Sequence, residues 1–187
     1  MAKKQATTRI IGGSLKGSKL PFKEHKSTRP TESKTKETLF NWLLNDLEGK
    51  TCLDMFAGTG SLGIEALSRG AKKVVFVEKK KSQVVSLKAN LKRLKVYDSS
   101  HVINANAFSI DFNNLPYQFD ILFIDPPFRE NLIQRSLDYI NSKNILSSRT
   151  LIYLECEREL ELEKITKDLN LLKKSKGSQT QYRLYES

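Results

Sequence analysis

The sequence predicts an α/β fold in which helices cover both faces of a mostly parallel β-sheet. Three observations support this prediction. From Thr51 onward, short apolar stretches of strand length alternate with stretches of helical periodicity. A glycine-rich loop, Gly58-x-Gly60-x-x-Gly63, separates the first of these strands from the helix that follows it. Polar residues come directly after several strands, and open sheets of this kind bind ligands at those strand ends.

The chain before this alternation is strongly basic. Residues 1–36 contain ten Lys or Arg residues and two Glu residues, which is a net charge of +8 out of +11 for all 187 residues. Positive charge concentrated in this way favours a polyanionic partner such as nucleic acid over a role in solubility alone. We therefore expect residues 1–36 to form a basic arm and residues 37–187 to form the main domain.

The first expected elements belong to this arm. Residues 1–8 are polar and expected to be disordered, whereas residues 9–11 and 18–22 suit a small hairpin around Gly12-Gly13. Residues 23–30 are expected to form a loop, and Thr31 is a candidate N-cap for the helix after it. That helix should end at Gly49. Its apolar stripe contains Leu39, Phe40, Leu43, Leu44 and Leu47.

The remaining chain supplies the alternating elements. Strands are expected at residues 51–55, 73–77, 102–104, 119–124 and 150–155. Helices are expected at residues 61–68, 130–140 and 157–166, together with one whose apolar face contains Val84, Leu87, Leu91 and Leu94. Two last strands, near residues 169–173 and 180–185, are joined by Gly177-Ser178 and predict a C-terminal hairpin.

Four polar residues follow the ends of four different strands: Asp54, Glu78, Asn106 and Asp125. Because the carboxyl ends of parallel strands lie at one edge of a sheet, we expect these side chains to converge on a ligand. Core packing does not explain them. The glycine spacing by itself also fits an NAD-dependent oxidoreductase, although no catalytic Tyr-Lys pair accompanies it.

Several longer motifs resemble a known family. Asp54-Met-Phe-Ala-Gly-Thr-Gly60 resembles motif I of the class I S-adenosylmethionine-dependent methyltransferases, and Asp125-Pro-Pro-Phe128 resembles their motif IV in enzymes that methylate exocyclic amino groups. Arg9-Ile-Ile-Gly-Gly13, Arg29-Pro-Thr31, Glu37-Thr-Leu-Phe-Asn-Trp42 and Tyr182-Arg-Leu-Tyr185 are similar to the RsmD family of bacterial 16S rRNA guanine-N2 methyltransferases. The resemblance covers nearly the whole chain. It implies a Rossmann-like fold with a seven-stranded, mostly parallel sheet, a C-terminal antiparallel hairpin and a small N-terminal β-hairpin extension.

The resemblance also implies S-adenosylmethionine as the cofactor. In the family pattern, Asp54 and the loop residues Phe56, Ala57, Gly58 and Gly60 hold the methionine portion of the cofactor. Glu78 suits the ribose diol as a bidentate acceptor. Asn106 and Ala107 match the position that reads adenine, where the Asn side chain can both accept and donate a hydrogen bond. A role for Asn106 as a turn residue is the structural alternative.

The Asp125-Pro-Pro-Phe128 loop is the candidate catalytic element. The N2 amine of guanine is a poor nucleophile because its lone pair is delocalised into the ring. The Asp125 carboxylate and the Pro126 carbonyl can accept hydrogen bonds from the two N–H groups of this amine. Pro126 and Pro127 stiffen the loop. Phe128 offers a face on which an extruded base can stack. Catalysis then consists of positioning and electrostatics, with no metal and no covalent nucleophile.

The expected partner is 16S rRNA within an assembling small ribosomal subunit, bound by a monomer. The arm is expected to contact RNA through Arg9, Lys16, Lys19, Lys23, Arg29 and Thr31. Its Lys and Arg side chains can bind phosphates, and Arg29 can alternatively reach the base or the cofactor. Two alternatives stay open: an adenine-N6 DNA methyltransferase, which also uses Asp-Pro-Pro-aromatic, and a non-catalytic RNA-binding protein with a vestigial cofactor fold. The first lacks a separate DNA-recognition domain, and the second does not explain why every motif is present.

The composition indicates in which cellular compartment we expect the protein. No apolar run reaches the length of a membrane-spanning helix, and the first residues lack the apolar core of a signal peptide, so we expect a cytoplasmic protein. Cys52 and Cys156 lie far apart in apolar strands and are expected to be reduced core thiols. With His25 and His101 isolated in the sequence, no metal site is expected.

Overall fold

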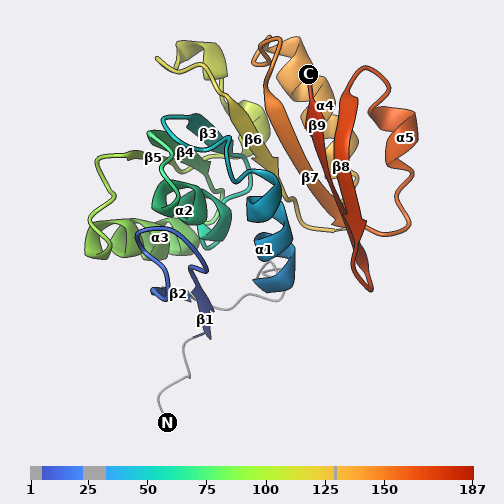
Figure 1. The fold of residues 1–187 in the computed structure, drawn as a ribbon. Helices are drawn as coiled ribbons and strands as arrows, with labels where there is room; N and C mark the ends of the chain where they lie inside the picture. Colours follow the sequence, from blue (N-terminus) through green and yellow to red (C-terminus); the bar gives the residue numbers. More distant parts are fainter. Residues whose placement is uncertain (1–5, 23–32, 129) are drawn as a thin grey trace.

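The computed structural model describes residues 6–22, 33–128 and 130–187, which form a three-layer α/β domain with a small hairpin against it (Figure 1). The main sheet has seven strands in the order β5-β4-β3-β6-β7-β9-β8. In that order the strands are Ser100–Ile103, Lys73–Val77, Thr51–Asp54, Ile121–Ile124, Leu151–Glu157, Thr180–Glu186 and Asn170–Lys176. The first five pair in parallel, and β9 lies antiparallel between β7 and β8. The expected sheet and its C-terminal hairpin are therefore confirmed.

The two faces of the sheet are covered by different helices. Helices α1 (Ser33–Trp42), α2 (Ser61–Ser68) and α3 (Lys81–Arg93) pack on one face, against sheet residues such as Phe76 and Phe123. Helix α4 (Leu132–Ser142) and the short α5 (Leu162–Ile165) pack on the other face, together with the 3₁₀ turns η1 (Ala107–Ser109) and η2 (Phe112–Asn114). Side chains along each strand alternate between the two clusters, as the pleat of a strand requires.

The N-terminal hairpin is packed on the domain. Its strands are β1 (Ala6–Arg9) and β2 (Lys19–Phe22), and Ile10 and Leu20 belong to the same core cluster as α1, α2 and α3. The side-chain amide of Asn90 on α3 donates to the carbonyl of Pro21 at 3.0 Å. The hairpin is confirmed, but the expectation of disorder is wrong for residues 6–8, because β1 pairs with β2 there. The expected loop at 23–30 and the Thr31 N-cap lie outside the described residues.

Several element boundaries differ from expectation. The first hairpin strand is Ala6–Arg9 rather than residues 9–11. Only Leu162–Ile165 of the expected helix 157–166 is helical, because β7 continues to Glu157, which pairs with Thr180 on β9. Helix α4 begins at Leu132 because Asn131 has a left-handed backbone with φ 51°. Helix α1 ends at Trp42, so Leu44 lies in the turns that follow and is 67% exposed rather than part of the apolar stripe.

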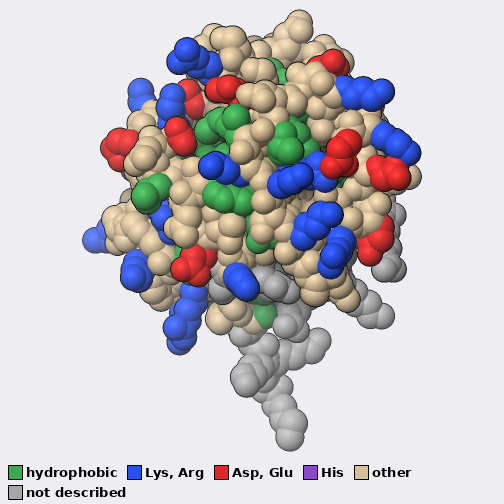
Figure 2. Space-filling model, turned by 45° about the vertical axis from the view of Figure 1, so that its right-hand side comes forward, with side chains coloured by type: hydrophobic (Ala, Val, Ile, Leu, Met, Phe, Trp, Pro, Cys, Tyr) green, Lys and Arg blue, Asp and Glu red, His purple; other side chains and the backbone are tan. Residues whose placement is uncertain are grey.

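The two cysteines, Cys52 and Cys156, are buried and free, as expected of core thiols. On the face that Figure 2 shows, Lys and Arg side chains are interspersed with Asp and Glu side chains rather than gathered in one basic patch. Within the described ranges, no helix is long and apolar enough to cross a membrane.

Candidate active site

The carboxyl ends of the central strands surround one pocket of about 410 Å³. This volume is within the range of small-molecule binding sites. Asp54, Glu78, Asn106 and Asp125 all line the pocket, each from a different strand end. Phe56, Ala57, Gly58, Ala107, Pro126, Pro127 and Phe128 complete the set of predicted residues found in its wall. The sequence-predicted cofactor and catalytic groups therefore share one cavity.

The glycine loop shapes the floor of this pocket. Gly60 has φ 77°, and a Cβ atom there would overlap the Leu87 side chain on α3. Gly60 is absent from the pocket wall, and its role is to make the turn into α2. A Cβ atom at Gly63 would overlap the ring of Phe76, so glycine at this position allows α2 to pack closely on the sheet. The amide of Gly63 donates to Asp54 Oδ2 at 3.1 Å, which joins the helix to the end of β3.

Asp54 is a strongly perturbed carboxyl group in the pocket wall. Its side chain is only 2% exposed. The pKa of Asp54 is raised to about 7, mainly by burial; the hydrogen bond from Gly63 opposes this effect, and the neighbouring charges of Asp125 and Glu78 add to it. A cation in the pocket would relieve each of these penalties, so the site favours a positively charged ligand group.

Backbone amides position the other predicted cofactor residues. Glu78 accepts from the amide of Gly58 at 2.9 Å through Oε2 and from the amide of Lys80 at 2.6 Å through Oε1. Asn106 caps η1 by accepting from the amide of Phe108 at 3.0 Å, so it has the turn role considered above and also lines the pocket. This bond uses the side-chain oxygen, and the side-chain nitrogen can serve as a donor to a ligand.

Ser61 and Glu155 are among the pocket residues that sequence reasoning missed. Ser61 begins α2, is 5% exposed, and its hydroxyl has no hydrogen-bond partner among the described residues. The signal was its place directly after the glycine loop, since helix N-termini bind anions. Glu155 on β7 is also 5% exposed and lines the pocket beside Asp125. It was expected as the last residue of a strand, so the strand-end argument applied to it as well.

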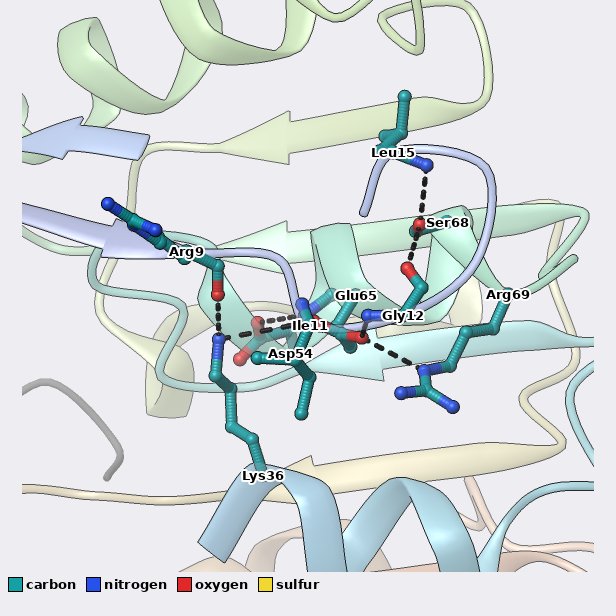
Figure 3. Close-up of polar contacts among 10 residues, drawn as sticks. Arg9, Ile11, Gly12, Leu15, Lys36, Asp54, Glu65, Ser68 and Arg69 are labelled. Atoms are coloured by element: carbon teal, nitrogen blue, oxygen red, sulfur yellow. Dashed lines mark hydrogen bonds and ion pairs between the residues drawn. The ribbon is translucent and has the colours of Figure 1, made fainter. Parts of the chain in front are cut away.

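A second polar cluster fixes the N-terminal hairpin to α2 (Figure 3). The carboxylate of Glu65, which is fully buried, accepts from the amides of Ile11 at 2.8 Å and Gly12 at 2.7 Å. It also accepts from Arg69 Nε at 2.9 Å and lies 3.9 Å from Lys36 Nζ. Lys36 in turn donates to the carbonyl of Arg9 at 2.5 Å. Burial lowers the pKa of Lys36, Glu65 opposes that effect, and Arg69 adds to it.

The Arg9-Ile-Ile-Gly-Gly13 motif is thus a docking segment. Ser68 donates to the carbonyl of Gly12 at 2.5 Å and accepts from the amide of Leu15 at 2.9 Å. Gly13 has φ 72°, and a Cβ atom there would overlap the carbonyl of Ser68. The side chains of Arg9, Lys16 and Lys19 are nevertheless exposed on the docked hairpin. Of the predicted RNA contacts, Lys23, Arg29 and Thr31 fall outside the described residues.

The fold and the site together define a class I methyltransferase: a seven-stranded sheet with β9 inserted antiparallel, a glycine loop after β3, an acid after β4 and Asp-Pro-Pro-Phe after β6. A family model described as "Conserved hypothetical protein 95" matches residues 8–186. The chain belongs to this family, the RsmD family of ribosomal RNA small subunit methyltransferases.

Individual relatives agree with this assignment. Ribosomal RNA small subunit methyltransferase D of Haemophilus influenzae is 44% identical over 184 residues, which is 96% of this chain and 93% of that protein. The protein of the same name in Escherichia coli is 38% identical over 179 residues, covering 95% of this chain and 89% of the relative. A solved structure from Escherichia coli superposes with a TM-score of 0.85 at 36% identity, and the match covers 97% of this chain and 98% of that one.

Proposed function

We propose that the protein transfers the methyl group of S-adenosylmethionine to the exocyclic N2 amine of a guanine in 16S rRNA. One observation carries the proposal: the Asp125-Pro-Pro-Phe128 loop and the glycine loop open into the same pocket. A methyl donor held by the glycine loop would therefore lie beside groups suited to hold an amine.

The pocket residues fit this cofactor. The hydroxyl of Ser61 at the start of α2, which has no hydrogen-bond partner in the described part of the chain, suits the methionine carboxylate. Buried Asp54 suits the methionine amino group. Glu78, fixed by two backbone amides, would accept from the ribose hydroxyls. The side-chain nitrogen of Asn106 would donate to the adenine ring, next to Ala107. When bound, the cofactor supplies an electrophilic methyl group on a sulfonium.

The remaining steps belong to the protein. Asp125 and the Pro126 carbonyl accept hydrogen bonds from the two N–H groups of the target amine and favour pyramidal geometry at its nitrogen. Phe128 stacks on the extruded base, and the two prolines keep the loop rigid. Rate acceleration comes from holding the amine in line and from the negative charge of Asp125 near a nitrogen that becomes positive.

We assign the RNA-facing role to residues 1–36 and the methyltransferase role to residues 37–187. The net charge of +8 over the first 36 residues supports this division, as does the exposure of Arg9, Lys16 and Lys19 on the hairpin. We assign the same RNA-contacting role to Lys23, Arg29 and Thr31. We infer that the protein acts as a monomer in the cytoplasm, on 16S rRNA within an assembling small subunit.

Two measurements test the proposal. Calorimetry should give binding of S-adenosylmethionine and S-adenosylhomocysteine but not of NADH, and Glu78→Ala should weaken binding by about 1–3 kcal/mol. Glu159→Ala, an exposed acid outside the pocket, is the matched control. Tritiated methyl transfer to free and protein-bound 16S rRNA, followed by nucleoside analysis, should yield N2-methylguanosine. N6-methyladenosine in DNA, or NADH binding without binding of either sulfur ligand, would overturn it.

A further inference from the structure

Glu155 is a buried carboxylate beside the candidate catalytic loop, and the proposed cofactor contacts do not use it. Strands β6 and β7 pair in parallel as far as Ile124 and Leu154. The next residues are Asp125, directly after the end of β6, and Glu155, within β7. Both line the pocket. Glu155 is 5% exposed, and a buried carboxyl group is costly unless it is hydrogen-bonded.

A buried tyrosine holds this carboxylate in place. The hydroxyl of Tyr153 donates to Glu155 Oε2 at 2.7 Å, and the Tyr153 ring packs against Phe123 with a centroid separation of 6.5 Å. Burial raises the pKa of Tyr153 well above its usual range, and the charges of Glu155 and Asp125 add to that effect. The hydroxyl therefore stays protonated and acts as the donor. Since a carboxylate offers about four acceptor sites, Glu155 can accept from a ligand alongside the contacts that it already makes, including the bond from Tyr153.

The chemistry of the guanine edge matches this arrangement. Guanine presents N1–H beside the N2 amine, so it offers adjacent donors on its Watson–Crick edge. Adenine N1 carries no hydrogen and is itself an acceptor, so it cannot form a hydrogen bond with a carboxylate. Unstacked RNA bases are commonly read on this edge. A buried acceptor left without its donor gives strong discrimination, whereas shape alone gives little.

We propose that Glu155 selects guanine by accepting a hydrogen bond from the N1–H of the target base, while Asp125 and the Pro126 carbonyl hold its N2 amine. This inference rests on the proposed guanine-N2 activity and adds the residue that chooses the base. It assigns Tyr153 as a positioning residue, which fixes the carboxylate without touching the substrate.

Glu155→Gln gives a directional test. The amide oxygen that this substitution introduces can keep the bond from Tyr153, which turns the new NH₂ group toward the pocket as a donor. The substrates are small-subunit particles whose 16S rRNA carries guanine or 2-aminopurine at the nucleotide that the unmodified enzyme methylates. 2-Aminopurine keeps the N2 amine, but its N1 is an acceptor. We expect E155Q to lose at least about 100-fold in kcat/KM on guanine and to exceed the unmodified enzyme on 2-aminopurine.

Controls separate base selection from a structural role. Binding of S-adenosylhomocysteine to E155Q should stay within about twofold of the unmodified value, since no cofactor contact is assigned to Glu155. Tyr153→Phe should lower kcat/KM on guanine less than E155Q does, with no gain on 2-aminopurine.

Three results would overturn the inference: full activity of E155Q on guanine, equal loss on both bases with normal cofactor binding, or equal use of both bases by the unmodified enzyme. The proposed function fails separately, if the unmodified enzyme transfers no methyl group to guanine N2.

Discussion

Cofactor binding should depend on pH through Asp54. In the free protein, burial raises the pKa of this carboxyl to about 7. A ligand that places its ammonium group beside Asp54, as both S-adenosylmethionine and S-adenosylhomocysteine would, favours the ionised carboxylate, so binding lowers the pKa of Asp54. The free protein must then release a proton when it binds below or near pH 7. Affinity therefore rises with pH up to about 7 and levels off above it.

The magnitude follows from the fraction of free protein in which Asp54 is ionised. For a free pKa of about 7 and a bound pKa below about 5, affinity at pH 6 should be about fivefold lower than at pH 7 and about tenfold lower than at pH 8. About half a proton should be released per cofactor bound at pH 7. Stability has the opposite dependence: the folded protein binds this proton more tightly than the unfolded chain, so the unfolding free energy falls as pH rises from about 4 to 7.

Calorimetry with S-adenosylhomocysteine at pH 6, 7 and 8, in two buffers of different ionisation enthalpy, measures both affinity and proton release. Asp54→Asn is the matched control, because the amide oxygen can still accept from Gly63. This variant should bind more weakly at pH 8, lose the dependence on pH between 6 and 8, and unfold at higher denaturant concentration at pH 8. If the unmodified protein and the Asn variant changed affinity equally with pH, the role of Asp54 would be refuted.

The convergence of the strand-end residues was predictable because it follows from local information. A strand is visible as an apolar stretch, and parallel strands place their carboxyl ends at one edge whatever their order. Asp54, Glu78, Asn106 and Asp125 therefore met in one pocket without any knowledge of the register. The same reasoning from local signals reached the C-terminal hairpin, because Gly177-Ser178 separates two strand-like stretches.

The docking of the hairpin was not predictable in this way. Its contacts join Ile11 and Gly12 to Glu65, more than 50 positions later in the sequence, and each contact uses a backbone amide that carries no side-chain signature. One clue was present: Glu65 is an acid within the otherwise uncharged helix 61–68, whose residues are all buried. The error over residues 157–166 has a related cause. Charged residues suggested a helix there, but pairing with β9 extended β7 to Glu157.

Three further sets of variants test the catalytic loop, the hairpin and the buried Glu65 carboxylate. Asp125→Ala should lower the rate of single-turnover methyl transfer by roughly 10²–10³-fold without unfolding the protein, and Asp125→Asn should keep more activity than the Ala variant. Equal rates for the Ala variant and the unmodified enzyme would mean that the loop is only a structural turn. Charge reversal at Lys16 and Lys19 should weaken RNA binding and flatten its salt dependence while cofactor affinity holds, and an unchanged salt slope would place the RNA surface elsewhere. Glu65→Gln should lower the unfolding free energy by about 3–5 kcal/mol, because buried Lys36 loses its opposite charge 3.9 Å away. Adding Lys36→Met to that variant removes the stranded charge and should recover part of the loss, since a well-packed apolar side chain carries no such penalty. Denaturant unfolding of the single and double variants measures these free energies. If the unfolding free energy of Glu65→Gln lay within about 0.5 kcal/mol of the unmodified value, the scale of an ordinary surface substitution, Glu65 would not hold the hairpin.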